Sequence, residues 1–371
     1  MSDKARDSGA FDSRSHKSLR RSPWGWRSTQ GAARPEAPNG GIATYAALDL
    51  GTNNCRLLVA RPAREGFRVV DAFSRIIRLG EGISGSGRIS DAAIVRAVDA
   101  LSICRDKMAN RGVTRARLIA TEACRAAANG VDFRQRIVDE VGLDLEIVDR
   151  ATEAELAATG CAPLVDPEVD GVILFDIGGG SSELVRLGRA APLGHGPAVP
   201  RIETWASLPV GVVTLAERYG GHVVSRETYE QMVQEVAGHL RPFVAAAGPA
   251  SVDRMHLLGT SGTVTTIAGV HLDLKRYDRR RVDGCWMTAD EANAVIEQLI
   301  DMSYEERAAS PCIGAERADL VLAGCAILEA IRREYPCRRL RVADRGLREG
   351  MLVQMMRADG IWNGVETLGH G

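Results

Sequence analysis

One stretch of the chain predicts a strand, a tight turn and a second strand. The apolar run 172–175 leads into Asp176, and Gly178, Gly179 and Gly180 follow before apolar residues resume after Glu183. Glycines let the backbone turn tightly and bring successive N–H groups to an anion. The two acids flank this turn, and a cation can offset the repulsion between an acid and a phosphate. The pattern therefore predicts a site for phosphate and a metal ion.

The same pattern occurs once before, at residues 47–57. The two stretches align without a gap, with equivalent positions 127 residues apart. Asp49 aligns with Asp176, whereas Arg56 stands where the later copy has Glu183. The repeat predicts two related lobes that face one ligand; two unrelated hairpins with glycine turns are the alternative.

A third turn of this kind is expected at residues 259–263, between a strand at 256–258 and a helix from 264. Free N–H groups and the helix dipole at such a turn attract anions. Helical spacing of apolar residues, with Ser90 as a cap, predicts a helix over 91–108. Further strands are expected at 67–75, 117–121, 145–148, 202–208 and 339–342, and helices at 133–141, 152–160, 215–219, 227–244, 289–300, 315–335 and 347–358.

Composition narrows the class of protein. The chain has 371 residues and a formal net charge of −1, which suits two domains and gives no sign of a general nucleic-acid partner. No apolar run approaches the ~18 residues of a membrane span. The eight cysteines include no CxxC pair, so we expect reduced thiols and a cytoplasmic protein. Residues 1–40 are rich in Lys, Arg, Ser, Gly and Pro, which predicts a disordered basic arm.

Several motifs, taken in order, resemble the exopolyphosphatase / guanosine pentaphosphate phosphohydrolase family. The chain ends soon after the last of them, so it resembles the short, two-domain form. The motifs are Asp49-Leu50-Gly51-Thr52-Asn53, Ala120-Thr121-Glu122-Ala123-Cys124-Arg125, Thr152-Glu153-Ala154, Asp176-Ile177-Gly178-Gly179-Gly180-Ser181-Ser182-Glu183-Leu184, Ser207-Leu208-Pro209-Val210-Gly211, Gly259-Thr260-Ser261-Gly262-Thr263 and Arg348-Glu349-Gly350.

The resemblance implies an α/β fold of two actin-like (ribonuclease H-like, ASKHA) lobes, each with a mixed five-stranded sheet, and a cleft between them. We place the first lobe at 41–150 and the second at 151–346. The C-terminal segment 347–371 is expected to pack back on the first lobe.

The resemblance also assigns roles to individual residues. Glu153 would be the catalytic glutamate that orients or deprotonates water, and Arg125 a phosphate-binding arginine. Asp176 and Glu183, with Asp49 as a weaker candidate, would hold Mg²⁺, or Mn²⁺ in its place. Phosphates would be bound by Gly51, Thr52, Asn53, Asn54, Gly178, Gly179, Gly180, Ser181, Thr260, Ser261 and Gly262.

The implied activity is Mg²⁺-dependent release of terminal orthophosphate from inorganic polyphosphate. Hydrolysis of guanosine pentaphosphate is a close alternative, because both substrates end in a phosphoanhydride. Arg150 and Thr152 stand where the family usually has glycine and acids, which motivates a third reading, a polyphosphate- or nucleotide-binding regulator with weak turnover. A kinase or ATPase of the same superfamily is a fourth. A basic run at 275–281 would suit a polyanion or a solvated loop, and the resemblance leaves a homodimer open.

Overall fold

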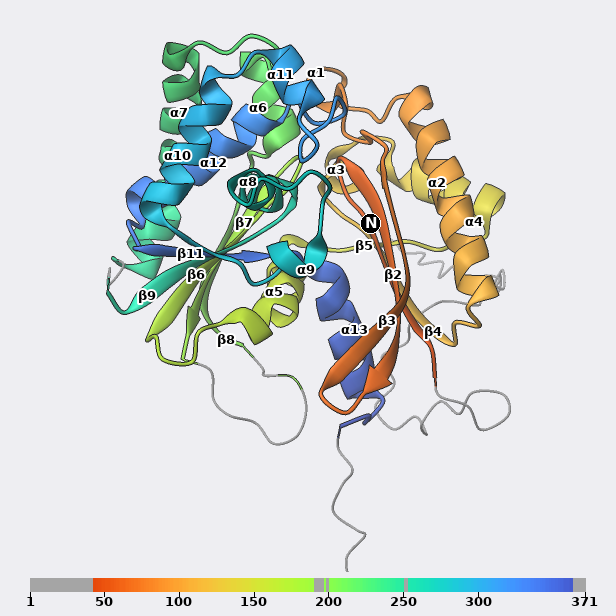
Figure 1. Cartoon of the computed structure of the whole chain (residues 1–371). Helices are drawn as coiled ribbons and strands as arrows, with labels where there is room; N and C mark the ends of the chain where they lie inside the picture. The colour runs from red at the N-terminus through yellow and green to blue at the C-terminus, as the bar shows by residue number, and fades with distance from the viewer. Residues whose placement is uncertain (1–42, 190–196, 198–199, 250–252, 363–371) are drawn as a thin grey trace, which may run out of the picture.

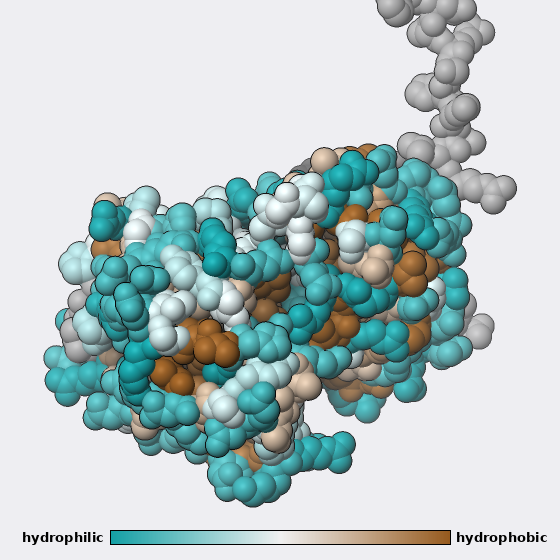
Figure 2. All heavy atoms as spheres, turned by 90° about the horizontal axis from the view of Figure 1, so that it is seen from above, coloured by the Kyte–Doolittle hydropathy of each residue, from teal (hydrophilic) through white to brown (hydrophobic). Residues whose placement is uncertain are grey.

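The computed structural model describes residues 43–189, 197, 200–249 and 253–362 and consists of two α/β lobes with two helices between them (Figure 1). The predicted basic arm and the last part of the C-terminal segment, 363–371, lie outside the described residues. No helix of the described ranges is long and apolar enough to cross a membrane. Seen from above, most of the molecule's surface is hydrophilic, with apolar residues in several separate areas (Figure 2).

The first lobe is built on a mixed five-stranded sheet, as predicted. Its strand order is β3-β2-β1-β4-β5, with β1 antiparallel to β2 and parallel to β4. The strands are β1 (Tyr45–Leu50), β2 (Asn54–Ala63), β3 (Gly66–Ile76), β4 (Arg115–Ala120) and β5 (Glu146–Ile147). Helices α2 (Asp91–Asn110) and α4 (Gly130–Val141) bury their apolar faces on one side of this sheet. Ser90 caps α2 by accepting a hydrogen bond from the N–H of Ala93, at 3.3 Å.

The second lobe has six strands, so the prediction of a five-stranded sheet is wrong here. The order is β10-β11-β9-β6-β7-β8. The strands are β6 (Gly171–Ile177), β7 (Ser182–Gly188), β8 (Arg201–Leu208), β9 (Met255–Thr260), β10 (Trp286–Thr288) and β11 (Arg339–Ala343). The additional strand, β10, is an edge strand of three residues. Such a segment is too short to show the apolar–polar alternation by which a strand is found in a sequence.

Five longer helices complete this lobe, and most of its core lies between them and one face of the sheet. They are α6 (Val212–Tyr219), α7 (Arg226–Ala247), α8 (Gly262–His271), α10 (Ala289–Asp301) and α12 (Val321–Glu334). The short elements of the chain are α1 (Ile83–Ser86), α3 (Glu122–Ala126), η1 (Ala162–Leu164), α9 (Arg279–Val282) and α11 (Tyr304–Ala309). The helix predicted from residue 315 begins only at Val321, because residues 315–320 form turns after Gly314, which has a φ of 75°.

Helices α5 (Arg150–Cys161) and α13 (Leu347–Ala358) lie between the two sheets (Figure 1). Helix α13 packs on the first sheet through Met351, Leu352, Met355 and Met356, whereas α5 contributes to cores on both sides. The two helices touch backbone to backbone. A Cβ atom on Gly350 would lie 2.1 Å from the carbonyl oxygen of Leu156, and one on Gly160 would lie 2.0 Å from that of Gly346.

The two predicted hairpins, β1–β2 and β6–β7, have the same geometry. Asp49 pairs with Arg56 across the first hairpin, and Asp176 pairs with Glu183 across the second. The turns close with equivalent hydrogen bonds of 2.9 Å, from the N–H of Gly51 to Asn54 and from that of Gly178 to Ser181. Each first strand also pairs in parallel with a later one, β4 or β9. The internal repeat is therefore present in the fold.

Candidate active site

The turns of the two hairpins meet at a cavity between the lobes. A Cβ atom on Gly179 would lie 2.9 Å from the Cβ of Thr52, and one on Gly180 would lie 3.1 Å from its Oγ1. Asp49 and Asp176, at the ends of the equivalent strands, both line the cavity. The predicted confrontation of two duplicated turns is thus confirmed. The glycines of the second turn are needed for this approach, since a side chain there would meet the first lobe.

Most predicted site residues line this cavity, but two do not. Those that line it are Asp49, Gly51, Thr52, Asn53, Asn54, Glu153, Asp176, Gly178, Gly179, Gly180, Ser181, Glu183, Ser261 and Gly262. Thr260 lies at the end of β9 and donates its hydroxyl hydrogen bond to the carbonyl of Arg345, at 2.6 Å. Arg125 lies beside Glu153, outside the lining.

Glu153 reaches the cavity from the first turn of α5, which Asp149 caps by accepting from the N–H of Thr152 at 2.8 Å. The Glu153 side chain is 6% exposed, and its Oε1 accepts a hydrogen bond of 2.6 Å from Arg125. The same guanidinium also donates to Glu122 and to the carbonyl of Val148. In this arrangement Arg125 orients Glu153, and four of its five N–H groups donate to protein acceptors. Arg150 pairs with Glu122 at 2.9 Å rather than with Glu153.

Burial sets the protonation of these acids. Desolvation and the neighbouring Glu183 raise the pKa of Glu153 to about 8, against the opposing effect of Arg125. Desolvation, Glu183 and Asp49 raise the pKa of Asp176 to about 7. A carboxylate with a pKa near neutrality is suited to accept a proton from water.

The oxygen atoms around the cavity fit a hard cation. Asp49 Oδ1, Asn53 Oδ1 and Asn54 Oδ1 are buried without a hydrogen-bond donor among the described residues. Glu183 Oε1 accepts from Ser181 and Ser207, each at 2.8 Å, which fixes that carboxylate. Within the described ranges, no three His, Cys, Asp or Glu side chains form a ready metal-ligand set. An ion here would take its remaining ligands from water and phosphate, as Mg²⁺ commonly does.

The sequence matches a known family over most of its length. The profile of the Ppx/GppA phosphatase family covers residues 58–359. The chain belongs to this family.

Two curated relatives match this chain over nearly their whole length. "Exopolyphosphatase 2" of Mycobacterium tuberculosis is 28% identical over 331 residues, which is 85% of this chain and 99% of that protein. A "putative exopolyphosphatase" of Haemophilus influenzae is 24% identical over 320 residues, which is 85% of this chain and 92% of the relative.

Solved structures of the family share the fold. A Ppx/GppA family member from Aquifex aeolicus superposes with a TM-score of 0.70 at 26% identity. An exopolyphosphatase from Cytophaga hutchinsonii superposes with a TM-score of 0.75 at 25% identity. Each comparison covers 85% of this chain and 98% of the other. The two-lobed, actin-like architecture of the Ppx/GppA family is therefore the fold of this protein.

Arg317 is a basic residue of this Ppx/GppA site that the sequence analysis did not assign, as is Arg56. Arg317 lines the cavity, and its guanidinium has no hydrogen-bond or ion-pair partner in the described part of the chain. Its Nη1 is the nearest atom, at 3.9 Å, to a Cβ placed on Gly262 at the N-terminus of α8. The residue was missed because it was predicted to lie within a helix, whereas it lies in the turns before α12. Gly314 marks only that the helix does not extend back across it, which does not place the start of α12 as late as Val321.

The predicted basic run lies outside the cavity. Lys275 pairs with Asp273 at 2.9 Å on the surface, and Arg279 pairs with Glu349 at 2.8 Å. Arg280 and Arg281 are exposed on α9. Part of this run therefore holds α9 against the start of α13.

A clasp joins the two lobes beside the cavity. Arg78 donates to both carboxylate oxygens of Asp319, at 2.9 and 3.0 Å. Glu217 accepts from the N–H of Gly82 at 2.8 Å and from the hydroxyl of Ser84 at 2.6 Å. With the contact of Gly179 and Thr52, these bonds define a closed arrangement of the lobes.

Proposed function

We propose that this protein is an exopolyphosphatase, which hydrolyses the terminal phosphoanhydride of inorganic polyphosphate and releases orthophosphate. The observation that carries the proposal is that Glu153 lines one cavity with both glycine turns. The names of the curated relatives of similar length point to the same activity.

Each part of the site has a role in this proposal. The N–H groups of the two glycine turns and the N-terminus of α8 bind phosphate oxygens, together with Arg317. Glu153 accepts a proton from the attacking water or orients it, and Arg125 fixes the carboxylate in place. Phosphoryl transfer needs little beyond such positioning and charge neutralisation.

Mg²⁺, or Mn²⁺ in its place, would be held by Asp176 and Glu183, with Asp49 as the third carboxylate. Its chemistry when bound would be neutralisation of charge on the phosphate oxygens. The partnerless Asp49 Oδ1 supports this assignment. Its test is direct titration of the protein with Mg²⁺, in which Asp49→Asn and Asp176→Asn are expected to weaken binding at least tenfold.

The deciding experiment measures orthophosphate release from long-chain polyphosphate by the wild type and by Glu153→Gln. Glu155→Gln is the matched control, since Glu155 is an exposed acid on the same helix. We expect release by the wild type and the control, and a loss of at least a hundredfold in Glu153→Gln. Equal rates for all three would refute the role of Glu153.

Parallel assays distinguish the alternatives. Faster hydrolysis of guanosine pentaphosphate than of polyphosphate would favour a guanosine pentaphosphate phosphohydrolase. Faster turnover of ATP than of polyphosphate would favour a kinase or ATPase. Tight binding of polyphosphate with no release in Mg²⁺ would instead favour a regulator.

Location and assembly are also proposals. The eight cysteines, all within the described residues, are unpaired, which suits the reducing cytoplasm that we propose. Sedimentation of the full chain would test the proposed homodimer.

A further inference from the structure

A second, smaller cavity lies behind the active-site cavity. The two share lining residues, among them Asp49, Asp176, Arg56 and Ser261. The rear cavity continues past these residues to Arg345 and Arg348, at the start of α13. The role assignments above use none of its three arginines.

Two of these arginines have no acceptor. Neither Arg56 nor Arg348 forms a hydrogen bond or an ion pair through its guanidinium with any described residue. The charged neighbours of Arg348 include Glu349 and Asp49 but also the like-charged Arg56. Two guanidinium groups that converge on a small cavity without hydrogen-bonded acceptors are a favourable site for an anion.

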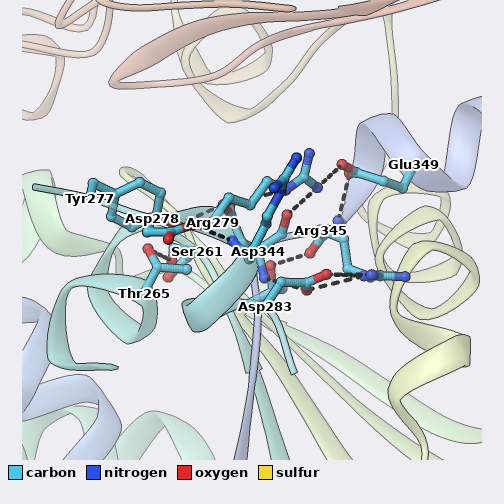
Figure 3. A network of polar contacts seen from close by, with 12 residues as sticks. Ser261, Thr265, Tyr277, Asp278, Arg279, Asp283, Asp344, Arg345 and Glu349 are labelled. Carbon is cyan, nitrogen blue, oxygen red and sulfur yellow. Dashed lines mark hydrogen bonds and ion pairs between the residues drawn. The ribbon is translucent and has the colours of Figure 1, made fainter. Parts of the chain in front are cut away.

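The neighbouring arginines show that this lack of acceptors is local (Figure 3). Arg345 pairs with Asp283 through its Nε at 3.1 Å, and Arg279 donates to Glu349 at 2.8 Å. Asp344, another acid of the rear cavity, accepts from the hydroxyl of Tyr277 at 2.7 Å. Arg345 and Asp344 are thus satisfied although they line the rear cavity, whereas Arg56 and Arg348 are the arginines of its lining without an acceptor among the described residues.

The other unsatisfied groups of the rear cavity complement a protonated phosphate. Ser261 has a left-handed φ of 110° and a buried Oγ without a partner, which can donate to a phosphate oxygen. The carboxylate of Asp49, proposed above as a metal ligand, also lines this cavity. Two guanidinium forks and one hydroxyl can bind a tetrahedral oxyanion, and the carboxylates of Asp49, Asp176 and Asp344 that also line the cavity favour an oxyanion that still carries a proton.

We propose that the rear cavity binds the orthophosphate released in the active site and is its way out. This inference rests on the proposed function. While a shortened polyphosphate occupies the cleft, a second opening would let the product leave without dissociation of the chain. Arg345 lines both the rear cavity and a surface groove between the β2–β3 turn and α5, and the proposed route to solvent leads past it into this groove.

The first test measures binding of inorganic phosphate by titration calorimetry in the Glu153→Gln background, in which turnover is expected to be at least a hundredfold lower. We expect Arg348→Met to raise the Kd for phosphate at least tenfold. The control is Arg88→Met. Arg88 is an exposed arginine that lines neither cavity, so this substitution is expected to leave the Kd unchanged. An unchanged Kd in Arg348→Met overturns the proposal.

The second test follows the products of the otherwise wild-type enzyme. In Arg348→Met we expect inhibition by added orthophosphate to weaken at least tenfold, and chains of intermediate length to accumulate during polyphosphate digestion. The first cleavage of each chain should stay within threefold of the wild type. Unchanged inhibition and chain-length distribution would count against the rear cavity as an exit.

A folding defect is detected separately. If Arg348→Met does not fold, Arg348→Lys keeps a cation but loses the two-pronged donor, and should raise the Kd about threefold; an unchanged Kd then overturns the proposal. If no variant or wild type releases phosphate from polyphosphate, the proposed function fails, whereas the titration still reports on the rear cavity.

Discussion

Gly179 lies against Thr52 so closely that no side chain fits between them. A Cβ atom on Gly179 would lie 2.9 Å from the Cβ of Thr52, and that Cβ is branched and held in a buried turn. The contact joins the second lobe to the first at the active-site cavity. It therefore makes closure of the lobes depend on one glycine.

We predict that Gly179→Ala prevents full closure and lowers kcat/KM for polyphosphate at least tenfold. The unfolding free energy should change by less than about 1 kcal/mol, because the lobes can separate slightly instead of unfolding. Gly85→Ala is the control, since a Cβ on Gly85 meets nothing within 4 Å. Activity of Gly179→Ala equal to that of this control would contradict the prediction.

The second prediction concerns pH and activity. Because Glu153 acts in its ionised form and its pKa is raised to about 8, kcat/KM should rise with pH and level off above that value. The rise should be absent from the residual activity of Glu153→Gln. A profile that is flat between pH 6 and pH 9 in the wild type would exclude Glu153 as the base.

The third prediction concerns pH and stability. The folded protein keeps the Glu153 proton up to about pH 8, whereas the unfolded chain releases it near the ordinary value of 4.5. The unfolded state therefore binds fewer protons between these values, and the contribution of Glu153 to stability falls as pH rises through this window. Glu153→Gln lacks this loss, so it should gain on the order of 3 kcal/mol relative to the wild type between pH 5 and pH 8. Denaturant unfolding at both pH values measures the difference; a constant difference would contradict it.

The fourth prediction concerns the clasp. Removing the Arg78–Asp319 pair by Asp319→Asn should raise KM for polyphosphate about fivefold, because the closed form is less populated. The side chains are 31% and 19% exposed, so the pair should contribute only about 1 kcal/mol to stability. A double-mutant cycle with Arg78→Gln checks that both substitutions act through one interaction. Additive effects on KM would show that they do not.

The fifth prediction concerns the contact of α5 with α13. Gly350→Ala would drive a Cβ into the backbone of Leu156, so we expect a loss of about 3 kcal/mol or more in unfolding free energy. Gly238→Ala is the matched control, an exposed glycine in α7 with open space around it, and it should gain up to about 1 kcal/mol. Chemical denaturation of both variants measures the contrast, and equal stability would contradict it.

The sequence was sufficient to predict the helices and strands with a strong apolar periodicity and to predict the internal repeat. The hairpins at Asp49 and Asp176 were found because glycine turns and strand alternation are local signals, and the structure gives them the same register. Strand β10 was missed because three residues carry too little pattern, and its pairing with β11 is decided by tertiary packing.

The site was predicted in part, for similar reasons. Residues fixed by the turns, such as Gly179 and Ser181, lie at the cavity as expected. Which acceptors Arg125 meets depends on the packing of α3 against α5, and no spacing in the sequence contains that information. Arg317 reaches the cavity from a turn in a segment that the sequence pattern predicted to be helical.

The repeated hairpins are equal in backbone but opposite in charge at one position. Arg56 faces Asp49 in the first copy, where Glu183 faces Asp176 in the second. A cleft with a true twofold axis would accept a phosphate chain in either of two orientations. The exchange of a cation for an anion makes the two sides of the cavity electrostatically unlike, so a phosphate chain, whose two ends are chemically identical, should present its terminal group to the same side each time.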